Sequence, residues 1–304
     1  MKQVQFKGTG VALVTPFKNG KIDFTAFEKI IEHTLEGGVE YVVPLGTTGE
    51  AVTLSSQECR EVLDFTIRTV SARVPVVAGF FGHNDTASLA RKMRNYNFDG
   101  ISAVLSSSPA YSKPSQEGIY QHFMTLSDAS PVPIIMYNVP GRTCSNVSPE
   151  TTVRLAKASK KIVAIKEASG DMVHAMKILK DKPDHFQVLS GDDPTAMPFI
   201  ACGGDGIISV IANAYPRTFS DMIRAALAGN FAKAKTLNDQ LLNVHQWLYV
   251  EGNPVGIKAA MEILGMCNKD VRLPLVPQSA PNYDLLKSEM ERVEKMQPEG
   301  ASIG

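Results

Sequence analysis

Short apolar segments recur along the chain, and each is followed by a stretch long enough for a helix. Most of these segments are apolar at successive positions instead of alternating with polar residues, which is typical of parallel strands covered on both faces. They predict strands at residues 10–14, 41–44, 74–78, 100–105, 133–137, 162–165, 186–189 and 206–210.

The segments between the predicted strands carry helix signals. Asp23 precedes apolar residues at helical spacing, and Ser55 with Glu58 matches a capping box. Ser148 is followed by a proline, the arrangement of an N-cap and a first-turn residue. The repeated strand–helix units favour an α/β fold, a closed (β/α)8 TIM barrel, over an open doubly wound sheet. No GxGxxG motif follows the first strand, which argues against a dinucleotide-binding fold.

The pattern changes after about residue 217. Helical periodicity continues there over residues 219–227, 231–248, 255–264 and 283–296, with no strand-like segment between them. We therefore predict two units, a (β/α)8 barrel over residues 1–223 and a C-terminal helical appendage over residues 224–304.

Composition argues against several classes of protein. The 304 residues include 31 basic and 31 acidic side chains, so no electrostatic footprint for nucleic acid is present. No apolar run approaches the length of a membrane span, and residues 1–10 contain no apolar signal core, so we expect a cytoplasmic protein. The histidines show no HxH or HExxH spacing and the cysteines no CxxC pair, which gives a metal site weak support. We expect the cysteines to be buried small apolar residues: Cys59, Cys144, Cys202 and Cys267.

Candidate chemistry lies where the predicted strands end, because active sites of such barrels lie at the carboxyl ends of the strands. Residues 162–165 are all apolar, and Lys166 follows them directly. An amine carried into a cavity by a buried strand is poorly solvated, which favours its neutral, nucleophilic form. Alternatively, Lys166 is a surface lysine just past a strand end, paired with Glu167 or Asp171.

Three other strand ends carry polar groups, each with a plainer interpretation. The loop at residues 46–50 (GTTGE) could hold a small carboxylate with hydroxyl and backbone N–H groups, or be a tight turn. Tyr137 could shuttle a proton beside an amine, or be a core tyrosine. Arg142 could clamp a substrate carboxylate, or be a solvated loop arginine. Asp192 and Asp193 could position a polar substrate, although for Asp193 a helix N-cap is the simpler interpretation.

Taken together and in this order, the motifs resemble the dihydrodipicolinate synthase family of the pyruvate-dependent class I aldolases, a superfamily that also holds N-acetylneuraminate lyase. The resemblance runs from about Gly8 into the helical tail. It is carried by residues 46–50 (GTTGE), 137–143 (YNVPGRT), 165–167 (IKE), 190–193 (SGDD), 203–209 (GGDGIIS) and 251–254 (EGNP).

The resemblance implies a lyase or synthase that condenses pyruvate with L-aspartate 4-semialdehyde to 4-hydroxy-tetrahydrodipicolinate, in lysine and diaminopimelate biosynthesis. Lys166 would form a Schiff base with pyruvate and turn its methyl group into an enamine nucleophile. Tyr137 would act as general acid and base, linked through Thr48 to Tyr111 in a proton relay. In the family, the residue matching Tyr111 enters the site of a neighbouring subunit. This implies a homotetramer, a dimer of dimers.

The resemblance also implies the substrate contacts. Thr47 and Thr48 would bind the pyruvate carboxylate, and Arg142 would bind the carboxylate of the second substrate. Three further positions would contact bound substrate: Gly191, the backbone carbonyl of Ile208, and Asp192 near the substrate amino group. The expected partners are therefore small molecules, without nucleic acid, membrane, metal or organic cofactor.

Lysine inhibits some members of the family at a separate site. The matching positions here are Ala51, Ser56, Cys59, Ser88 and Ala110. A pocket for a zwitterionic amino acid needs carboxylate and hydroxyl partners, and these residues supply few of them. We predict that lysine inhibits this protein weakly or not at all.

Two other functions stay open. The first is another pyruvate-dependent aldolase, such as N-acetylneuraminate lyase or a 2-keto-3-deoxy sugar acid aldolase. Arg142 favours the synthase over these, because a small carboxylated aldehyde needs a cation. The second is a non-catalytic barrel that binds keto acids as a sensor. The complete set of Lys166, Tyr137, Thr48 and Tyr111 argues against that function.

Overall fold

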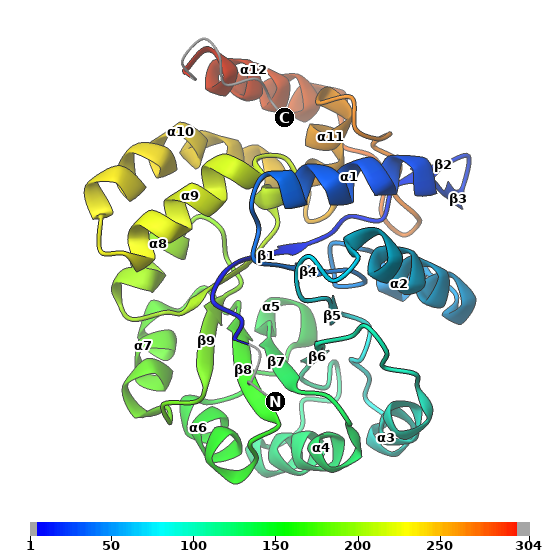
Figure 1. The fold of residues 1–304 in the computed structure, drawn as a ribbon, viewed down its shortest axis with the longest axis vertical. Coiled ribbons are helices and arrows are strands. Elements are labelled where there is room, and N and C mark those ends of the chain that lie inside the picture. Colours follow the sequence, from blue (N-terminus) through cyan, green and yellow to red (C-terminus); the bar gives the residue numbers. More distant parts are fainter. Residues whose placement is uncertain (1–4, 297–304) are drawn as a thin grey trace.

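The computed structural model describes residues 5–296, in which eight parallel strands form a barrel surrounded by helices (Figure 1). The strands neighbour each other in the order β4-β1-β10-β9-β8-β7-β6-β5, and a parallel bridge between Val42 and Val76 brings the two ends of this series together. The predicted (β/α)8 barrel is therefore confirmed. Its strands are β1 (Gly8–Ala12), β4 (Tyr41–Val43), β5 (Val77–Ala78), β6 (Ala103–Ser107), β7 (Ile134–Asn138), β8 (Ile162–Glu167), β9 (Gln187–Ser190) and β10 (Gly206–Ser209).

Some strand ends differ from the prediction. β1 begins at Gly8, before the predicted residue 10, and β6 begins at Ala103, after the predicted residue 100. Gly100 has a φ of 78°, a left-handed conformation that an extended strand excludes. Two short antiparallel strands, β2 (Phe17–Lys18) and β3 (Lys21–Ile22), form a hairpin apart from the barrel sheet.

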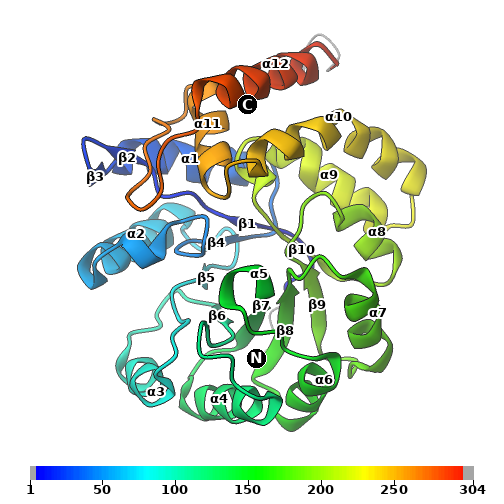
Figure 2. The same cartoon turned by 180° about the vertical axis from the view of Figure 1, so that it is seen from behind.

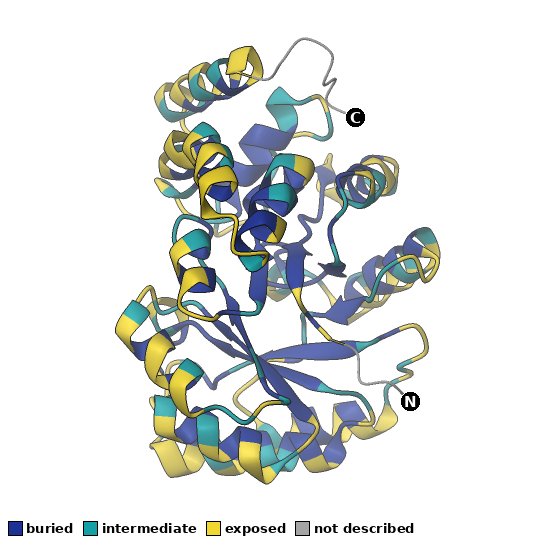
Figure 3. Ribbon diagram, turned by 60° about the vertical axis from the view of Figure 1, so that its left-hand side comes forward, coloured by how far each residue is buried: buried dark blue, intermediate teal, exposed yellow. Residues whose placement is uncertain are grey.

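The barrel strands are buried along most of their length (Figure 3), and apolar side chains cover both of their faces, as their mostly apolar segments predict. One cluster fills the interior of the barrel and includes Phe6, Tyr41, Leu105, Tyr137 and Ile208. A larger cluster lies between the sheet and the surrounding helices and continues into the C-terminal helices. The site described below lies at the carboxyl end of the interior cluster.

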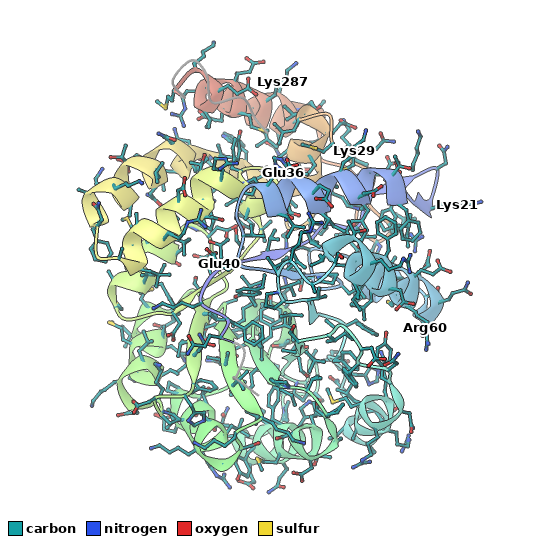
Figure 4. The ribbon with its side chains drawn as sticks, in the orientation of Figure 1. Lys21, Lys29, Glu36, Glu40, Arg60 and Lys287 are labelled. Carbon is teal, nitrogen blue, oxygen red and sulfur yellow. The ribbon has the colours of Figure 1, made fainter. Side chains whose placement is uncertain are left out.

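The helices around the barrel begin where their caps predict. Asp23 accepts a hydrogen bond from Ala26 N, Ser55 and Glu58 form the capping box, and Ser148 caps its helix. The exposed charged side chains of Lys21, Arg60 and Lys287 lie on outer elements in Figure 4. The helices are α1 (Phe24–Glu36), α2 (Ser56–Val70), α3 (Thr86–Asn95), α4 (Gln116–Ala129), α5 (Pro140–Thr143), α6 (Pro149–Ala158), α7 (Met172–Asp181), α8 (Ala196–Ala201) and α9 (Pro216–Leu227), with short 3-10 turns η1 (Ala51–Thr53) and η2 (Ile211–Asn213).

Three more helices follow the barrel and pack against one another beside α9 and α1 (Figures 1 and 2). They are α10 (Phe231–Tyr249), α11 (Val255–Ile263) and α12 (Ala280–Met296), close to the predicted ranges. The predicted boundary at residue 223 falls inside α9, and the division into two units stays a prediction.

The prediction that the cysteines are buried is wrong for two of them. Cys59 is buried and Cys267 is half-buried, but Cys144 and Cys202 are exposed because each caps the end of a short helix at the surface.

Within residues 5–296, no helix combines the length and apolar character that crossing a membrane requires. The same residues contain no group of three or more His, Cys, Asp or Glu side chains that could hold a metal ion.

Candidate active site

Tyr137 and Lys166 are neighbours at the carboxyl ends of two adjacent strands. In the register of β7 and β8, Tyr137 pairs with Lys166 and Asn138 pairs with Glu167. Successive side chains of a strand point to opposite faces, so these two pairs face opposite sides of the sheet. Tyr137 belongs to the interior cluster, which places Lys166 on the interior face of the barrel as well.

The amine of Lys166 is buried but has no polar partner among residues 5–296. The residue is 5% exposed, and its Nζ lies 4.6 Å from the centre of the Tyr137 ring. Among the residues that the structure describes, no hydrogen bond or ion pair engages Lys166 Nζ or the Tyr137 hydroxyl. The alternative of a surface lysine paired with Glu167 or Asp171 is therefore wrong. The amine remains available to a bound carbonyl compound.

Gly191 keeps the space beside Lys166 open. It follows β9, and its N–H donates to the carbonyl of Glu167 at 2.7 Å. A Cβ at this position would lie 2.9 Å from Lys166 Cε and 2.6 Å from Ala168 Cβ, which is closer than packed carbon atoms approach. A side chain at residue 191 would therefore displace Lys166.

Glu167 points away from the barrel interior, as the strand alternation requires. Its Oε2 accepts a hydrogen bond from Asn138 Nδ2 at 2.8 Å, and its Oε1 accepts one from Ser169 N at 2.7 Å. His174 Nε2 lies 3.4 Å from the same Oε2, and this contact raises the pKa of His174 above its ordinary value, against the opposite effect of burial. The Glu167 carboxylate is thus fully used in holding strand and helix together.

The loop at residues 46–50 lies after β4, at the carboxyl end of that strand. Two turn hydrogen bonds close the loop, and Thr48 is buried. Thr48 Oγ1 accepts a hydrogen bond from Asn253 Nδ2 at 3.0 Å, while the carbonyl of Asn253 accepts one from Arg142 Nη2 at 3.2 Å. Arg142 is on α5, which lies in front of the strands in Figure 2. Asn253 therefore links the loop to Arg142.

Among the described residues, the other predicted site residues make no hydrogen bond to Lys166, Tyr137 or Thr48. Tyr111 is 91% exposed with a left-handed φ of 66°, and its N–H donates to the carbonyl of Thr143. Asp192 is half-buried and accepts a hydrogen bond from Thr195 Oγ1 at 2.6 Å. Thr47 is half-buried in the loop, and Ile208 belongs to the interior cluster. No hydrogen bond among the described residues joins Thr48 to Tyr137 or Tyr111, so the relay stays a prediction.

Asp193 is not a helix N-cap, so that prediction is wrong. The cap position of α8 is Thr195, which makes no side-chain cap bond. The buried carboxylate of Asp193 instead accepts hydrogen bonds from Val210 N, Ile211 N and the Tyr249 hydroxyl. It ties the end of β10 to α10, and these partners are distant in sequence.

Comparison with known proteins shows which family the chain belongs to. A model of the dihydrodipicolinate synthetase family matches residues 5–293. The chain belongs to this family. The 4-hydroxy-tetrahydrodipicolinate synthase of Flavobacterium psychrophilum is 48% identical over 272 residues, covering 89% of this chain and 92% of the relative.

Solved structures of the dihydrodipicolinate synthetase family have the same barrel. Dihydrodipicolinate synthase from Aquifex aeolicus superposes with a TM-score of 0.91 at 38% identity, covering 95% of this chain and 98% of that one. A structure described as the first monomeric dihydrodipicolinate synthase variant has a TM-score of 0.92 at 36% identity, covering 95% and 97%. This family member therefore shares its fold with them over 95% of its length.

Three residues of the site were not predicted from the sequence of this family member. Asn253 lies in the segment that contributes to the resemblance, but it received no role of its own. Glu50 and Lys258 form a buried ion pair, described below, that reaches the loop at residues 46–50. A signal for Lys258 was present, since a lysine inside the apolar sequence of α11 needs a partner when it is buried.

Proposed function

We propose that this member of the dihydrodipicolinate synthetase family is a 4-hydroxy-tetrahydrodipicolinate synthase. It condenses pyruvate with L-aspartate 4-semialdehyde in lysine and diaminopimelate biosynthesis. The observation that carries the proposal is the buried amine of Lys166, which bonds to no group of the described residues and lies beside the phenol of Tyr137. The name of the Flavobacterium psychrophilum relative, 48% identical to this chain, supports the choice of substrates.

The amine of Lys166 opens the reaction by forming a Schiff base. Nζ attacks the keto carbon of pyruvate, and loss of water leaves a protonated imine. The imine withdraws electrons from the methyl group, which loses a proton and becomes an enamine. The enamine carbon then forms a bond to the aldehyde carbon of the second substrate, whose oxygen takes up a proton. Attack of the substrate's own amino group on the imine carbon closes the ring and releases Lys166.

Tyr137 and Thr48 supply the proton transfers and hold pyruvate. In the part of the chain that the structure describes, the Tyr137 hydroxyl has no hydrogen-bond partner, so it can exchange protons with a bound intermediate. Asn253 Nδ2 already donates to Thr48 Oγ1, so the proton of Thr48 is free to point elsewhere. These two hydroxyl groups support the proposed proton relay, which runs from Tyr137 through Thr48 to Tyr111. Thr47 and Thr48 bind the pyruvate carboxylate with the N–H groups of their loop.

Arg142 binds the carboxylate of aspartate semialdehyde. The carbonyl of Asn253 holds one of its guanidinium nitrogens at 3.2 Å, which leaves the other donors for a substrate. Gly191 and the carbonyl of Ile208 contact the bound substrate, with Asp192 near its amino group. Changing Arg142 to Ala should raise the KM for aspartate semialdehyde far more than the KM for pyruvate, and equal losses would favour another aldolase.

We also propose that the protein is a cytoplasmic homotetramer in which Tyr111 completes the site of a neighbouring subunit. The support is that Tyr111, 91% exposed, and Val52, 99% exposed, leave an aromatic and an apolar side chain uncovered in one chain. Sedimentation of the purified protein measures the assembly. A fully active monomer would contradict the sharing of Tyr111.

The covalent step provides the direct test. Borohydride reduction in the presence of pyruvate should add one reduced pyruvate to the intact mass, and Lys166→Ala should abolish the addition. A product assay with pyruvate and aspartate semialdehyde, run beside cleavage of N-acetylneuraminate, identifies the second substrate. If wild-type protein forms no pyruvate adduct, the proposed function fails. If it cleaves N-acetylneuraminate instead, a sugar acid aldolase replaces the synthase.

A further inference from the structure

The loop at residues 46–50 is bracketed by two strained residues. Leu45 has a φ of 62° and Glu50 has a φ of 52°, which places both in the left-handed region that non-glycine residues rarely adopt. Both are buried. Residues in such conformations persist only where their surroundings determine them, and they gather at ligand-binding sites. Each end of the loop should therefore have an anchor.

The anchor at the first end is the close approach of Gly79. A Cβ at residue 79 would lie 2.5 Å from Gly46 N, so only glycine lets the chain after β5 pack against the loop. Gly79 N also donates to the carbonyl of Pro44 at 3.0 Å. These contacts come from within the barrel.

The anchor at the second end comes from the C-terminal region. Glu50 Oε1 accepts a hydrogen bond from Lys258 Nζ at 2.5 Å, and Oε2 accepts one from Arg272 N at 2.9 Å. Lys258 Nζ also donates to the carbonyl of Asp270 at 2.8 Å and lies 4.0 Å from the Phe17 ring. The side chains of Glu50 and Lys258 are 1% and 0% exposed. Both oxygens of Glu50 are therefore held by residues that follow the barrel.

Stability alone does not account for this pair. A buried ion pair is on average no more stabilising than apolar residues of the same volume, because both charges lose their water. Burial lowers the pKa of Lys258, and the charge of Glu50 opposes that change. The pair instead fixes an orientation. Its charge-assisted hydrogen bonds hold the Glu50 carboxylate in one position, and with it the strained backbone next to Thr48.

We propose that Glu50 and Lys258 are positioning residues, through whose ion pair the C-terminal helices hold residues 46–50 in the form that binds the carboxylate of pyruvate. The inference rests on the proposed function, because it takes pyruvate as the ligand of Thr47 and Thr48. Without the anchor, the loop spends most of its time in relaxed conformations that do not bind the carboxylate. The apparent affinity for pyruvate falls by the same factor as the population of the binding form.

Lys258→Met and Glu50→Gln test the anchor with the full-length protein. We expect each to raise, by about tenfold, both the KM for pyruvate and the pyruvate concentration that gives half-maximal borohydride trapping. The KM for aspartate semialdehyde, which depends on Arg142, and kcat at saturating pyruvate should stay within about twofold. Lys269→Met is the matched control, because Lys269 pairs with Glu262 at 3.5 Å near the surface of the same region and should change none of these values.

A double variant separates positioning from folding. Lys258→Met leaves the Glu50 carboxylate buried without its partner, so its melting temperature should fall. Adding Glu50→Gln removes that charge and should restore the melting temperature, but pyruvate affinity should stay weak because the loop has lost its ionic anchor. Recovery of wild-type pyruvate affinity in the double variant would overturn the inference, and so would unchanged pyruvate affinity in both single variants. Failure of wild-type protein to trap pyruvate would instead refute the proposed function.

Discussion

The inner and outer faces of β7 and β8 differ in how their polar side chains are used. On the inner face, Tyr137 and Lys166 make contact with each other, and no described protein group bonds to the phenol or the amine. On the outer face, one residue further along each strand, Asn138 and Glu167 bond to each other and to neighbouring backbone and side-chain groups. Both pairs lie at the carboxyl ends of the same two strands, and all four residues are buried.

The difference shows what separates a reactive group from a structural one here. Desolvation acts on both faces, since Lys166 and Glu167 are both buried. A buried polar group without a partner is costly, so Lys166 and Tyr137 are retained at a cost that a bound substrate can offset. Glu167 has its partners already and stabilises the fold. Substitutions on the inner face should therefore reduce activity, and those on the outer face should reduce stability.

Lys166→Ala should have the largest effect. Removing the nucleophile should lower kcat by about 10⁴-fold or more, because no other group can form the Schiff base. The melting temperature should change little. Initial rates with pyruvate and aspartate semialdehyde, together with a thermal melt, measure both quantities.

Lys160→Ala is the matched control for this prediction. Lys160 lies just before the same strand, is exposed, and contacts His185 Nδ1 at 3.1 Å. It should keep the wild-type rate. Residual activity in Lys166→Ala within tenfold of wild type would mean that the inner face does not carry the reaction.

Gly191→Ala should have the next largest effect. The added methyl group would meet Lys166 Cε at 2.9 Å and push the amine away from the bound keto group. A displacement of about 1 Å can cost up to about 10²-fold, so kcat should fall by about 10- to 100-fold. Gly118→Ala on α4 is the control, since a Cβ there would meet no atom closer than 3.4 Å. Unchanged kcat in Gly191→Ala would show that the amine has more room than the structure indicates.

The sequence predicted the barrel and the inner face of the site well. Mostly apolar segments indicated every barrel strand, and barrel active sites lie at the carboxyl ends of strands, so position made Tyr137 and Lys166 candidates. The family resemblance then implied their roles. Alternation along a strand also requires Glu167 to lie on the opposite face from Lys166. These are local rules, and they need no knowledge of distant contacts.

The sequence could not predict the contacts that join distant segments. Glu50 and Lys258 are 208 positions apart, and nothing near either residue indicates the other. Asp193 precedes a proline, which favours a cap, but its partners Val210, Ile211 and Tyr249 depend on how the chain closes the barrel. The partners of a buried charge depend on how distant segments pack in the folded chain, whereas a strand depends mainly on its own residues.

Glu167→Gln tests the outer face. The amide keeps the shape of the side chain but presents an NH₂ group to one of the donors Asn138 Nδ2 and Ser169 N. The free energy of unfolding should fall by about 2 kcal/mol, as expected when a charged acceptor is lost. At saturating pyruvate, kcat should stay within about twofold. Urea titration and steady-state rates measure the two. A hundredfold loss of kcat with unchanged stability would reverse the roles of the two faces.

His174 should give the smallest effect, visible only in the pH dependence of stability. The nearby Glu167 carboxylate raises the pKa of His174 above its ordinary 6.5, with Asp171 and Glu150 acting in the same direction. The folded protein therefore holds the His174 proton more tightly than the unfolded chain does. The resulting stabilisation is complete below about pH 6.5 and is lost as the pH rises through the raised pKa. In urea titrations at pH 6 and pH 8, His174→Gln should lose more stability at pH 6 than at pH 8, with kcat unchanged. Equal losses at both values would mean that the His174–Glu167 contact acts through packing and not through charge.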